Sequence, residues 1–261
     1  MNAMLFEGRT IFVLWQRELL RMLQEPSRVL GVVIQPLMFW FVIGSGFVPS
    51  FRLAENETLD YQYFFFPGVL ALVILFSAIF STITLIEDRA SGFLQAVLVG
   101  PGSRSALVLG KIAGVVSIAC IQALLFLLVA PFAGISLEQM DFALVFLLTV
   151  LGSISMSGLG FVFAWVTASS AAYHALMSMI LIPMWILSGA MFPPKVGWIH
   201  TVVLLNPLGW LVAGFRAAFA AGQAPLGSVP SALTIEMCLL YLSLFSIFII
   251  GIGVLVCHRR R

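Results

Sequence analysis

Charged side chains are scarce in this sequence, and their scarcity excludes a water-soluble fold. Asp, Glu, Lys and Arg make up 9% of the 261 residues, whereas hydrophobic residues make up 61% and the mean hydropathy is +1.11. Between Phe142 and Pro194 there is no Asp, Glu, Lys or Arg. Such a chain has too few polar side chains to cover the surface of a soluble domain, so we expect it to lie in lipid.

The sequence also lacks the strict alternation, in segments of about ten residues, that marks a transmembrane barrel. Its apolar runs are continuous, and a helix needs about 20 such residues to cross roughly 30 Å of hydrocarbon. We therefore predict an all-α integral membrane protein with six transmembrane helices, at residues 29–48, 64–86, 112–136, 142–166, 174–192 and 233–257. The small polar residues 167–173 are the predicted turn between the fourth and fifth spans. An interface helix over residues 1–28 thus precedes a single transmembrane domain over residues 29–261.

Cysteines are few and follow no pattern. Cys120, Cys238 and Cys257 all lie inside predicted spans, and neither their number nor their spacing fits a disulfide framework or a metal site. We interpret them as small apolar packing residues. The sequence predicts no metal ion and no cofactor bound by this chain, and its formal charge of +2 gives no indication of nucleic acid.

Lys and Arg are distributed unevenly between the loops on the two sides of the membrane. Ten fall on one side of the predicted topology, and only Arg52, Lys195 and Arg216 fall on the other. Positive residues concentrate on the cytoplasmic side of membrane proteins. We therefore expect both termini in the cytoplasm, in a bacterial inner (plasma) membrane.

The first 28 residues are predicted to form an amphipathic helix, because charges interleave with apolar residues, unlike in a secretory signal. One side of the helical wheel carries Ile11, Phe12, Trp15, Leu19, Met22 and Leu23. The other carries Arg17, Glu18, Arg21, Gln24 and Glu25, and Leu14 breaks the pattern. Pro26 ends the helix. Such a helix either anchors the chain at the membrane surface with its arginines near lipid phosphates, or offers a docking surface to a cytoplasmic partner.

The cytoplasmic connection over residues 87–111 is longer than most of the others and begins with the charged residues Glu87-Asp88-Arg89. An amphipathic stretch follows Gly92 and stops at Gly100-Pro101-Gly102. We predict a short helix between Gly92 and Val99, bounded by glycine and proline. A charged cluster and a short helix at the inner surface suit a lever that another subunit pushes, while an ordinary solvated loop has a similar composition.

The outer connection over residues 193–232 is too apolar for a solvated loop. Asn206-Pro207 divides it, and Arg216 in its second half would cost about 2.5 to 3.5 kcal/mol at the centre of a crossing helix. We therefore predict a re-entrant helical hairpin whose backbone is buried against protein or water. Arg216 has two candidate partners, an ion pair with Glu236 or lipid phosphate, and the sequence does not choose between them.

Three stretches of the sequence point to a family. They are Gln35-Pro36-Leu37-Met38-Phe39; Asp88-Arg89 to Gly92 with Leu94, Leu98, Pro101, Arg104 and Gly110-Lys111; and Asn206-Pro207-Leu208 through Gly214-Phe215-Arg216. In this order and with six spans, they resemble the membrane subunits (permeases) of type-2 ABC transporters, in the branch of drug and lipooligosaccharide exporters. The chain departs from the family at Ala90 or Ser91, where an acidic residue is frequent, and at Phe93, where a threonine is frequent.

The resemblance implies an exporter built from two such subunits, this chain with a second copy or a close relative, and two cytoplasmic ABC ATPase subunits. ATP and magnesium belong to the ATPase, because Gly110-Lys111 is followed by Ile112 and lacks the other residues of a phosphate loop. We expect coupling to the ATPase at Arg17, Arg21, Glu87, Asp88, Arg89, Gly92 and Pro101. The signature of the re-entrant hairpin is Asn206, Pro207 and Arg216.

Two other function classes are alternatives. An intramembrane serine protease needs a Gly-x-Ser-Gly turn, and Ser157-Gly158 lacks the residues that begin it. An ion-coupled secondary transporter needs ionisable groups near mid-membrane, and the predicted spans before Glu236 have none. A path between two apolar subunits suits an amphiphilic, lipid-linked or drug-like substrate, with candidate walls at Phe39, Phe41, Phe76, Phe80 and Met177.

Overall fold

The computed structural model describes residues 2–47, 61–100, 102–193, 197–220 and 233–259, and these residues contain helices and no β-strand. The α-helices are α1 (Asn2–Gln24), α2 (Pro26–Phe47), α3 (Tyr61–Thr82), α4 (Thr84–Ala90), α5 (Phe93–Val99), α6 (Arg104–Leu127), α7 (Phe142–Val166), α8 (Ser170–Ile186), α9 (Gly197–Leu205), α10 (Pro207–Ala220) and α11 (Ile235–Arg259). Two short 3-10 helices, η2 (Ala130–Ala133) and η3 (Leu137–Gln139), lie between α6 and α7. The predicted all-α class is confirmed.

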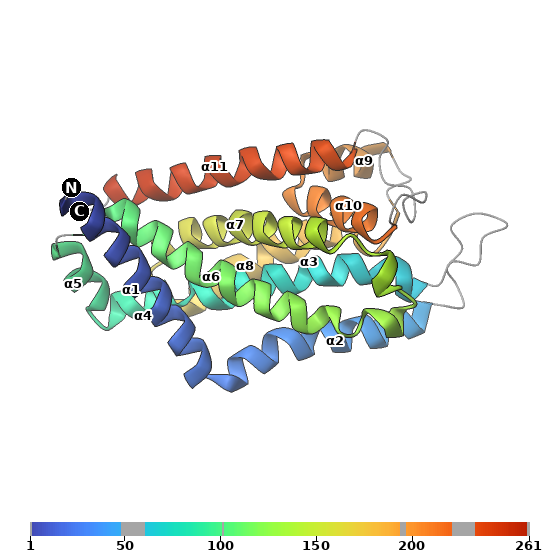
Figure 1. Cartoon of the computed structure of the whole chain (residues 1–261), viewed down its shortest axis with the longest axis horizontal. Helices are drawn as coiled ribbons and strands as arrows, with labels where there is room; N and C mark the ends of the chain where they lie inside the picture. Colours follow the sequence, from blue (N-terminus) through green and yellow to red (C-terminus); the bar gives the residue numbers. More distant parts are fainter. Residues whose placement is uncertain (1, 48–60, 101, 194–196, 221–232, 260–261) are drawn as a thin grey trace.

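The long helices α3, α6, α7 and α11 run side by side along the longest axis of the molecule (Figure 1). α3 is central: it packs against α2, α6 and α7, and the most apolar stretch of α3 and α4 together is 83% buried. α11 packs against α7 and α10 at the outside, and its most apolar stretch is only 22% buried. α4 and α5 lie at the same end of the bundle as the start of α1 and the end of α11, and α9 and α10 lie at the other end (Figure 1).

Among the described residues, four segments are long and apolar enough to cross a membrane. They are Tyr61–Ala90, which joins α3 and α4, and the helices α6, α7 and α11. The first and fifth predicted spans correspond to shorter apolar helices, Leu30–Gly46 within α2 and Ser170–Ile186. The integral membrane fold is therefore confirmed, while the count of six spans stays a prediction.

The predicted outer hairpin is present. α9 and α10 meet at an angle of 93°, and Asn206 stands between them. The Asn206 side chain accepts a hydrogen bond from the backbone N–H of Leu208 at 3.0 Å, which caps the start of α10. Its Nδ2 also donates to the carbonyl of Met184 in α8 at 2.6 Å. The bend is thus fixed to the neighbouring helix.

The predicted third span, 112–136, is wrong at both of its ends. α6 begins earlier, at Arg104, and ends at Leu127, after which the chain passes through η2 and η3. The prediction treats Lys111 as the last residue of a solvated loop, whereas Lys111 lies inside α6 and is 3% exposed. A charged lysine persists in such surroundings only where partners neutralise it.

Candidate functional site

Six charged side chains meet where three helices converge, at the end of the bundle that holds α4 and α5. We call them the charged cluster: Arg17, Glu18 and Arg21 from α1, Glu87 and Asp88 from α4, and Lys111 from α6. They carry three positive and three negative charges. Glu18, Asp88 and Lys111 are each at most 3% exposed, so the centre of the cluster is buried.

Asp88 is the centre of the charged cluster. Arg17 binds it with two nitrogens, Nη1 to Oδ2 at 2.9 Å and Nη2 to Oδ1 at 2.6 Å, which is the strong bidentate geometry of an arginine and a carboxylate. Lys111 Nζ also donates to Oδ2, and Arg21 Nη1 donates to Oδ1 at 3.3 Å. Arg21 pairs with Glu87 as well. Asp88 therefore ties both α1 and α6 to α4.

Lys111 joins the two buried carboxylates. Its Nζ donates to Glu18 Oε1 at 2.5 Å as well as to Asp88. The hydroxyl of Thr84 donates to Glu18 Oε2 at 3.2 Å, so both carboxylate oxygens of Glu18 are bound. A buried charge is stable only when it is paired, and these three buried groups therefore depend on one another.

Two glycines let α1 approach α6 closely enough for these contacts. A Cβ at Gly110 would lie 2.9 Å from Leu14 Cβ, and a Cβ at Gly114 would lie 2.6 Å from Glu18 Cβ. Larger residues at these positions would push α1 away from Lys111, which lies between them. α1 accordingly crosses α6 obliquely and in direct contact (Figure 1).

The short helix predicted after Gly92 is confirmed, and the charged cluster fixes its base. Gly92 separates α4 from α5 and has φ = 78°, a left-handed conformation that favours glycine. The Arg17 guanidinium lies 3.8 Å from the centre of the Phe93 ring, which is a cation–π contact. Val99, at the far end of α5, is 89% exposed. We call this bend at Gly92 the α4–α5 elbow.

A groove of about 670 Å³ opens between α1 and α4 beside the charged cluster. Its lining combines charged, polar and two apolar side chains: Val13, Gln16, Arg17, Leu20, Arg21, Gln24, Glu25, Glu87, Asp88 and Ser91. The side-chain hydrogen bond to Asp88 raises the pKa of Arg17 above its ordinary value, against the opposing effect of burial. The groove wall therefore keeps a positive charge, and its volume is that of a site that holds a ligand or partner side chains.

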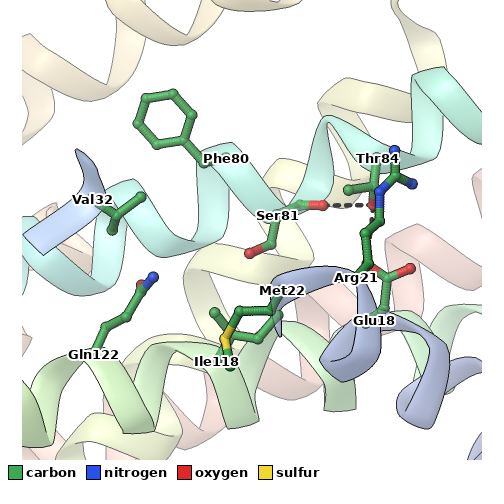
Figure 2. A pocket seen from close by; sticks show the side chains of 9 residues that line it. All are labelled: Glu18, Arg21, Met22, Val32, Phe80, Ser81, Thr84, Ile118 and Gln122. Carbon is green, nitrogen blue, oxygen red and sulfur yellow. Dashed lines mark hydrogen bonds between the residues drawn. The ribbon is translucent and has the colours of Figure 1, made fainter. Parts of the chain in front are cut away.

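A smaller cavity of about 30 Å³ lies next to the charged cluster and has room for a water molecule. Figure 2 shows its lining residues, which come from five helices: Glu18, Arg21, Met22, Val32, Phe80, Ser81, Thr84, Ile118 and Gln122. Gln122 accepts a hydrogen bond from Ser77 between α3 and α6. Polar groups thus continue from the charged cluster into the helix bundle.

Four of the seven predicted coupling residues meet in the charged cluster, namely Arg17, Arg21, Glu87 and Asp88. Gly92 forms the α4–α5 elbow, Arg89 faces the end of α7, and Pro101 lies outside the described residues. The geometry brings these residues to one end of the molecule. Their role in coupling stays a prediction.

Sequence reasoning missed Glu18 and Lys111. The helical wheel groups Glu18 with the outward polar residues, and the predicted loop boundary leaves Lys111 in solvent. A signal for Lys111 existed, because it interrupts an otherwise uncharged apolar run, and an ionisable residue in such a run implies a buried partner.

Of the two interpretations of α1, the one that places its arginines near lipid phosphates does not hold for two of its three arginines. Arg17 and Arg21 face the bundle, where both bind Asp88, while Arg9 is exposed. Leu14, which breaks the wheel pattern, is 3% exposed, whereas Phe12 and Leu23 are 57% and 70% exposed. The bidentate pairing of Arg17 with Asp88 and the close approach of α1 to α6 decide the orientation of α1. A helical wheel represents neither of these tertiary contacts.

Arg216 is enclosed at the other end of the bundle, with 2% exposure. Its Nη2 donates to the carbonyls of Gly189 at 2.7 Å and Ala190 at 3.4 Å, in the turn after α8, and its guanidinium lies 4.1 Å from the centre of the Phe64 ring. Glu236 is exposed at the start of α11, and no ion pair joins it to Arg216 in the described part of the chain. Carbonyl oxygens of the turn after α8 bind the guanidinium in place of the candidate ion pair.

Comparison with known proteins agrees with this architecture. Residues 9–220 match the family described as ABC-2 type transporter. The chain is 26% identical over 215 residues to the "Putative transport permease ycf38" of Cyanophora paradoxa, across 80% of this chain and 74% of that protein. It is 24% identical over 214 residues to the protein of the same name from Porphyra purpurea, with the same coverage.

A bacterial relative is also similar over part of its length. The chain is 24% identical over 162 residues to the "Probable multidrug ABC transporter permease YbhR" of Escherichia coli strain K12, across 59% of this chain and 42% of that protein. The family match takes in α1 from Arg9 onward, the charged cluster and the outer hairpin. This chain is therefore an integral membrane transport permease that belongs to the ABC-2 type transporter family.

Proposed function

We propose that this permease is the membrane subunit of an ATP-driven exporter. Two copies, or this chain and a close relative, span the membrane together, and two separate cytoplasmic ATPase subunits bind ATP and magnesium. Membership of the ABC-2 family and the multidrug ABC transporter named among the relatives support this assembly. The end that holds the charged cluster faces the cytoplasm of a bacterial cell in this proposal.

The charged cluster is the observation that carries the proposal. It binds α1, α4 and α6 to one another beside an open groove, and α5 extends from the same elbow. A partner that docks in the groove and presses on α5 displaces three elements together. Nucleotide can drive that movement only if it favours one arrangement of the ATPase over the other, because a ligand shifts an equilibrium by its differential affinity.

We place the substrate path on the face formed by α2, α3 and α8. A groove of about 130 Å³ there is lined by Gln35, Phe76, Ile79, Phe80, His174, Met177, Ser178 and Ile182. Phe76, Phe80 and Met177 are among the expected wall residues, and Phe39 and Phe41 are exposed on α2. Apolar walls with a few polar groups suit an amphiphilic, lipid-linked or drug-like substrate at the interface of two subunits.

Replacement of Gly92 tests the docking of the ATPase. Gly92→Val forces a β-branched residue into left-handed backbone, which distorts the α4–α5 elbow. We expect the tagged permease to insert normally into the membrane and to lose the cytoplasmic ATPase that copurifies with the wild type.

Gly134→Val is the matched control. Gly134 has φ = 77° and, like Gly92, open space around it, but it follows η2 and lies far from the charged cluster. The control should retain the ATPase. Retention by Gly92→Val would contradict the proposed docking, and transport by the permease alone in liposomes would contradict the proposed function.

A further inference from the structure

Arg89 follows Asp88 in α4 but contacts a different part of the molecule. Its Nη1 donates to the carbonyl of Thr167 at 2.9 Å, and its Nη2 donates to those of Trp165 at 2.8 Å and Ala164 at 3.4 Å. The guanidinium lies 5.6 Å from the centre of the Trp165 ring. Arg89 therefore holds the last turn of α7 and the first residue beyond it.

The acceptors of Arg89 are carbonyls that a helix leaves free. The last four carbonyls of an α-helix have no partner within the helix, and their partial negative charge attracts a cation. A guanidinium presents several donors in a rigid plane, so one arginine binds three such oxygens at once. The contact is specific to the end of α7.

The turn that Arg89 holds leads directly into α8. α7 ends at Val166 and α8 begins at Ser170, and Ser169 caps α8 by accepting a hydrogen bond from the backbone of Ala172 at 3.2 Å. The hydroxyl of Thr167 donates to the carbonyl of Phe163 at 2.7 Å. A three-residue connection that is bonded at both of its ends has little slack, so a displacement of Thr167 reaches α8.

α8 in turn forms one wall of the groove that we assign to the substrate path, through His174 and Met177. We propose that Arg89 is the positioning residue that transmits movement of the α4–α5 elbow to α8. Two neighbouring residues of α4 thus contact different helices. Asp88 binds α1 and α6, and Arg89 moves the connection between α7 and α8. This inference rests on the proposed function, because an ATPase must move the elbow.

A second contact at the same corner has a different origin. The hydroxyls of Tyr173 and Thr82 lie 2.5 Å apart. Thr82 is the last residue of α3 in the joined segment Tyr61–Ala90, whereas Arg89 lies near the other end of α4, close to the α4–α5 elbow. The Arg89 contact is made by α4 itself, and its loss should separate α8 from the elbow while Tyr173 still anchors α8.

Hydrogen–deuterium exchange of the purified permease–ATPase complex tests this assignment. Exchange is compared with and without a non-hydrolysable ATP analogue and magnesium, at α5 and at the first turn of α8. In the wild type, nucleotide should change the exchange of both segments. In Arg89→Gln, α5 should keep its response and the start of α8 should lose it.

Arg104→Gln is the matched control, because Arg104 makes the same kind of contact elsewhere. Its Nη1 donates to the carbonyls of Cys257 at 2.6 Å and His258 at 3.1 Å, at the end of α11. This variant should leave the responses of α5 and α8 unchanged. A role of Arg89 in stability alone would alter exchange near Thr167 in both nucleotide states, without removing the response of α8.

An unchanged nucleotide response of α8 in Arg89→Gln would overturn the proposal. If Arg89→Gln does not reach the membrane, Arg89→Lys takes its place: it keeps the charge but loses the planar fork, and its α8 response should be reduced. An undiminished response in Arg89→Lys would likewise overturn the proposal. A wild-type complex without any response at α5 would contradict the proposed function itself.

Discussion

Lys111 shows how a single ionisable residue is kept inside an apolar helix. An unpaired lysine costs about 2.5 to 3.5 kcal/mol at the centre of a membrane helix, and Lys111, the eighth residue of α6, is buried towards one end of the bundle, where partner charges offset its burial. Lys111 binds both Glu18 and Asp88, which are separated from it by 93 and 23 residues of sequence. Burial of each of these three charges alone would be unfavourable, and the pairing makes the burial of each depend on the other two.

Lys111→Met should therefore destabilise the permease more than a surface substitution. It removes the cation that is hydrogen-bonded to the buried Glu18, which then keeps only Arg17 at 3.6 Å and the Thr84 hydroxyl, and the removal of one member of a buried ion pair costs about 3 to 5 kcal/mol. The measurement is the midpoint of thermal unfolding of the purified permease in detergent.

Two variants control this experiment. Arg9→Met changes an exposed cation on the same helix and should leave the midpoint unchanged. Glu18→Gln combined with Lys111→Met also removes the buried negative charge that has lost its hydrogen-bonded lysine, and it should recover part of the loss. A single Lys111→Met variant with wild-type stability would show that the buried pairing is unnecessary.

At the scale of elements, the outer hairpin fixes the C-terminal end of α8. The carbonyls of Gly189 and Ala190 accept from Arg216 of α10, and the carbonyl of Met191 accepts from the Tyr61 hydroxyl at 3.1 Å. Asn206 binds the carbonyl of Met184 one turn earlier. The hairpin and Tyr61 of α3 thus supply the donors that this irregular backbone would otherwise lack in lipid.

Arg216→Gln should loosen this turn, whereas Glu236→Gln should not. Hydrogen bonds to a charged group contribute about 1.5 to 3 kcal/mol each, and Arg216 makes them to carbonyls. The measurement is the rate at which a thiol reagent reacts with Ser188→Cys, which stands in the buried turn at 2% exposure. Faster reaction is expected only with Arg216→Gln; an equal effect of Glu236→Gln would restore the ion pair suggested by the sequence.

Helix-breaking and helix-capping residues made most elements predictable from the sequence. Pro26, Gly92 and Asn206-Pro207 each mark a real boundary, and α7 has the predicted bounds because Asp141 caps it by accepting from the backbone of Leu144. The start of α6 also has a local signal that the prediction did not use, because Ser103 caps it by accepting from the backbone of Ala106 at 3.1 Å. The orientation of α1 was not predictable in this way, because it depends on pairing between Glu18 and Lys111, which are remote in sequence, and no local pattern encodes that contact.

At the scale of the whole molecule, both ends of the described chain lie beside α4 and α5, as expected from the predicted even number of crossings (Figure 1). Every member of the charged cluster lies at this end of the bundle. This arrangement separates the cluster from Arg216, which lies with the hairpin at the opposite end of the bundle.

Labelling of introduced cysteines should give the direction of insertion. In intact cells, a membrane-impermeant thiol reagent should label Lys195→Cys, and it should label Val99→Cys only after the membrane is opened. Val99 is suitable because it is 89% exposed, and the native Cys238 and Cys257 are buried. The reverse result would place the charged cluster outside the cell and remove its assignment to an ATPase.

The difference in burial between α3 and α11 has a consequence for which substitutions each helix tolerates. A helix enclosed on all sides must keep the volume of each side chain, because interiors are packed as densely as crystals. A helix with a largely exposed surface needs only side chains that are hydrophobic. Substitutions among Leu, Ile, Phe and Val should accumulate more freely along the exposed face of α11 than along α3.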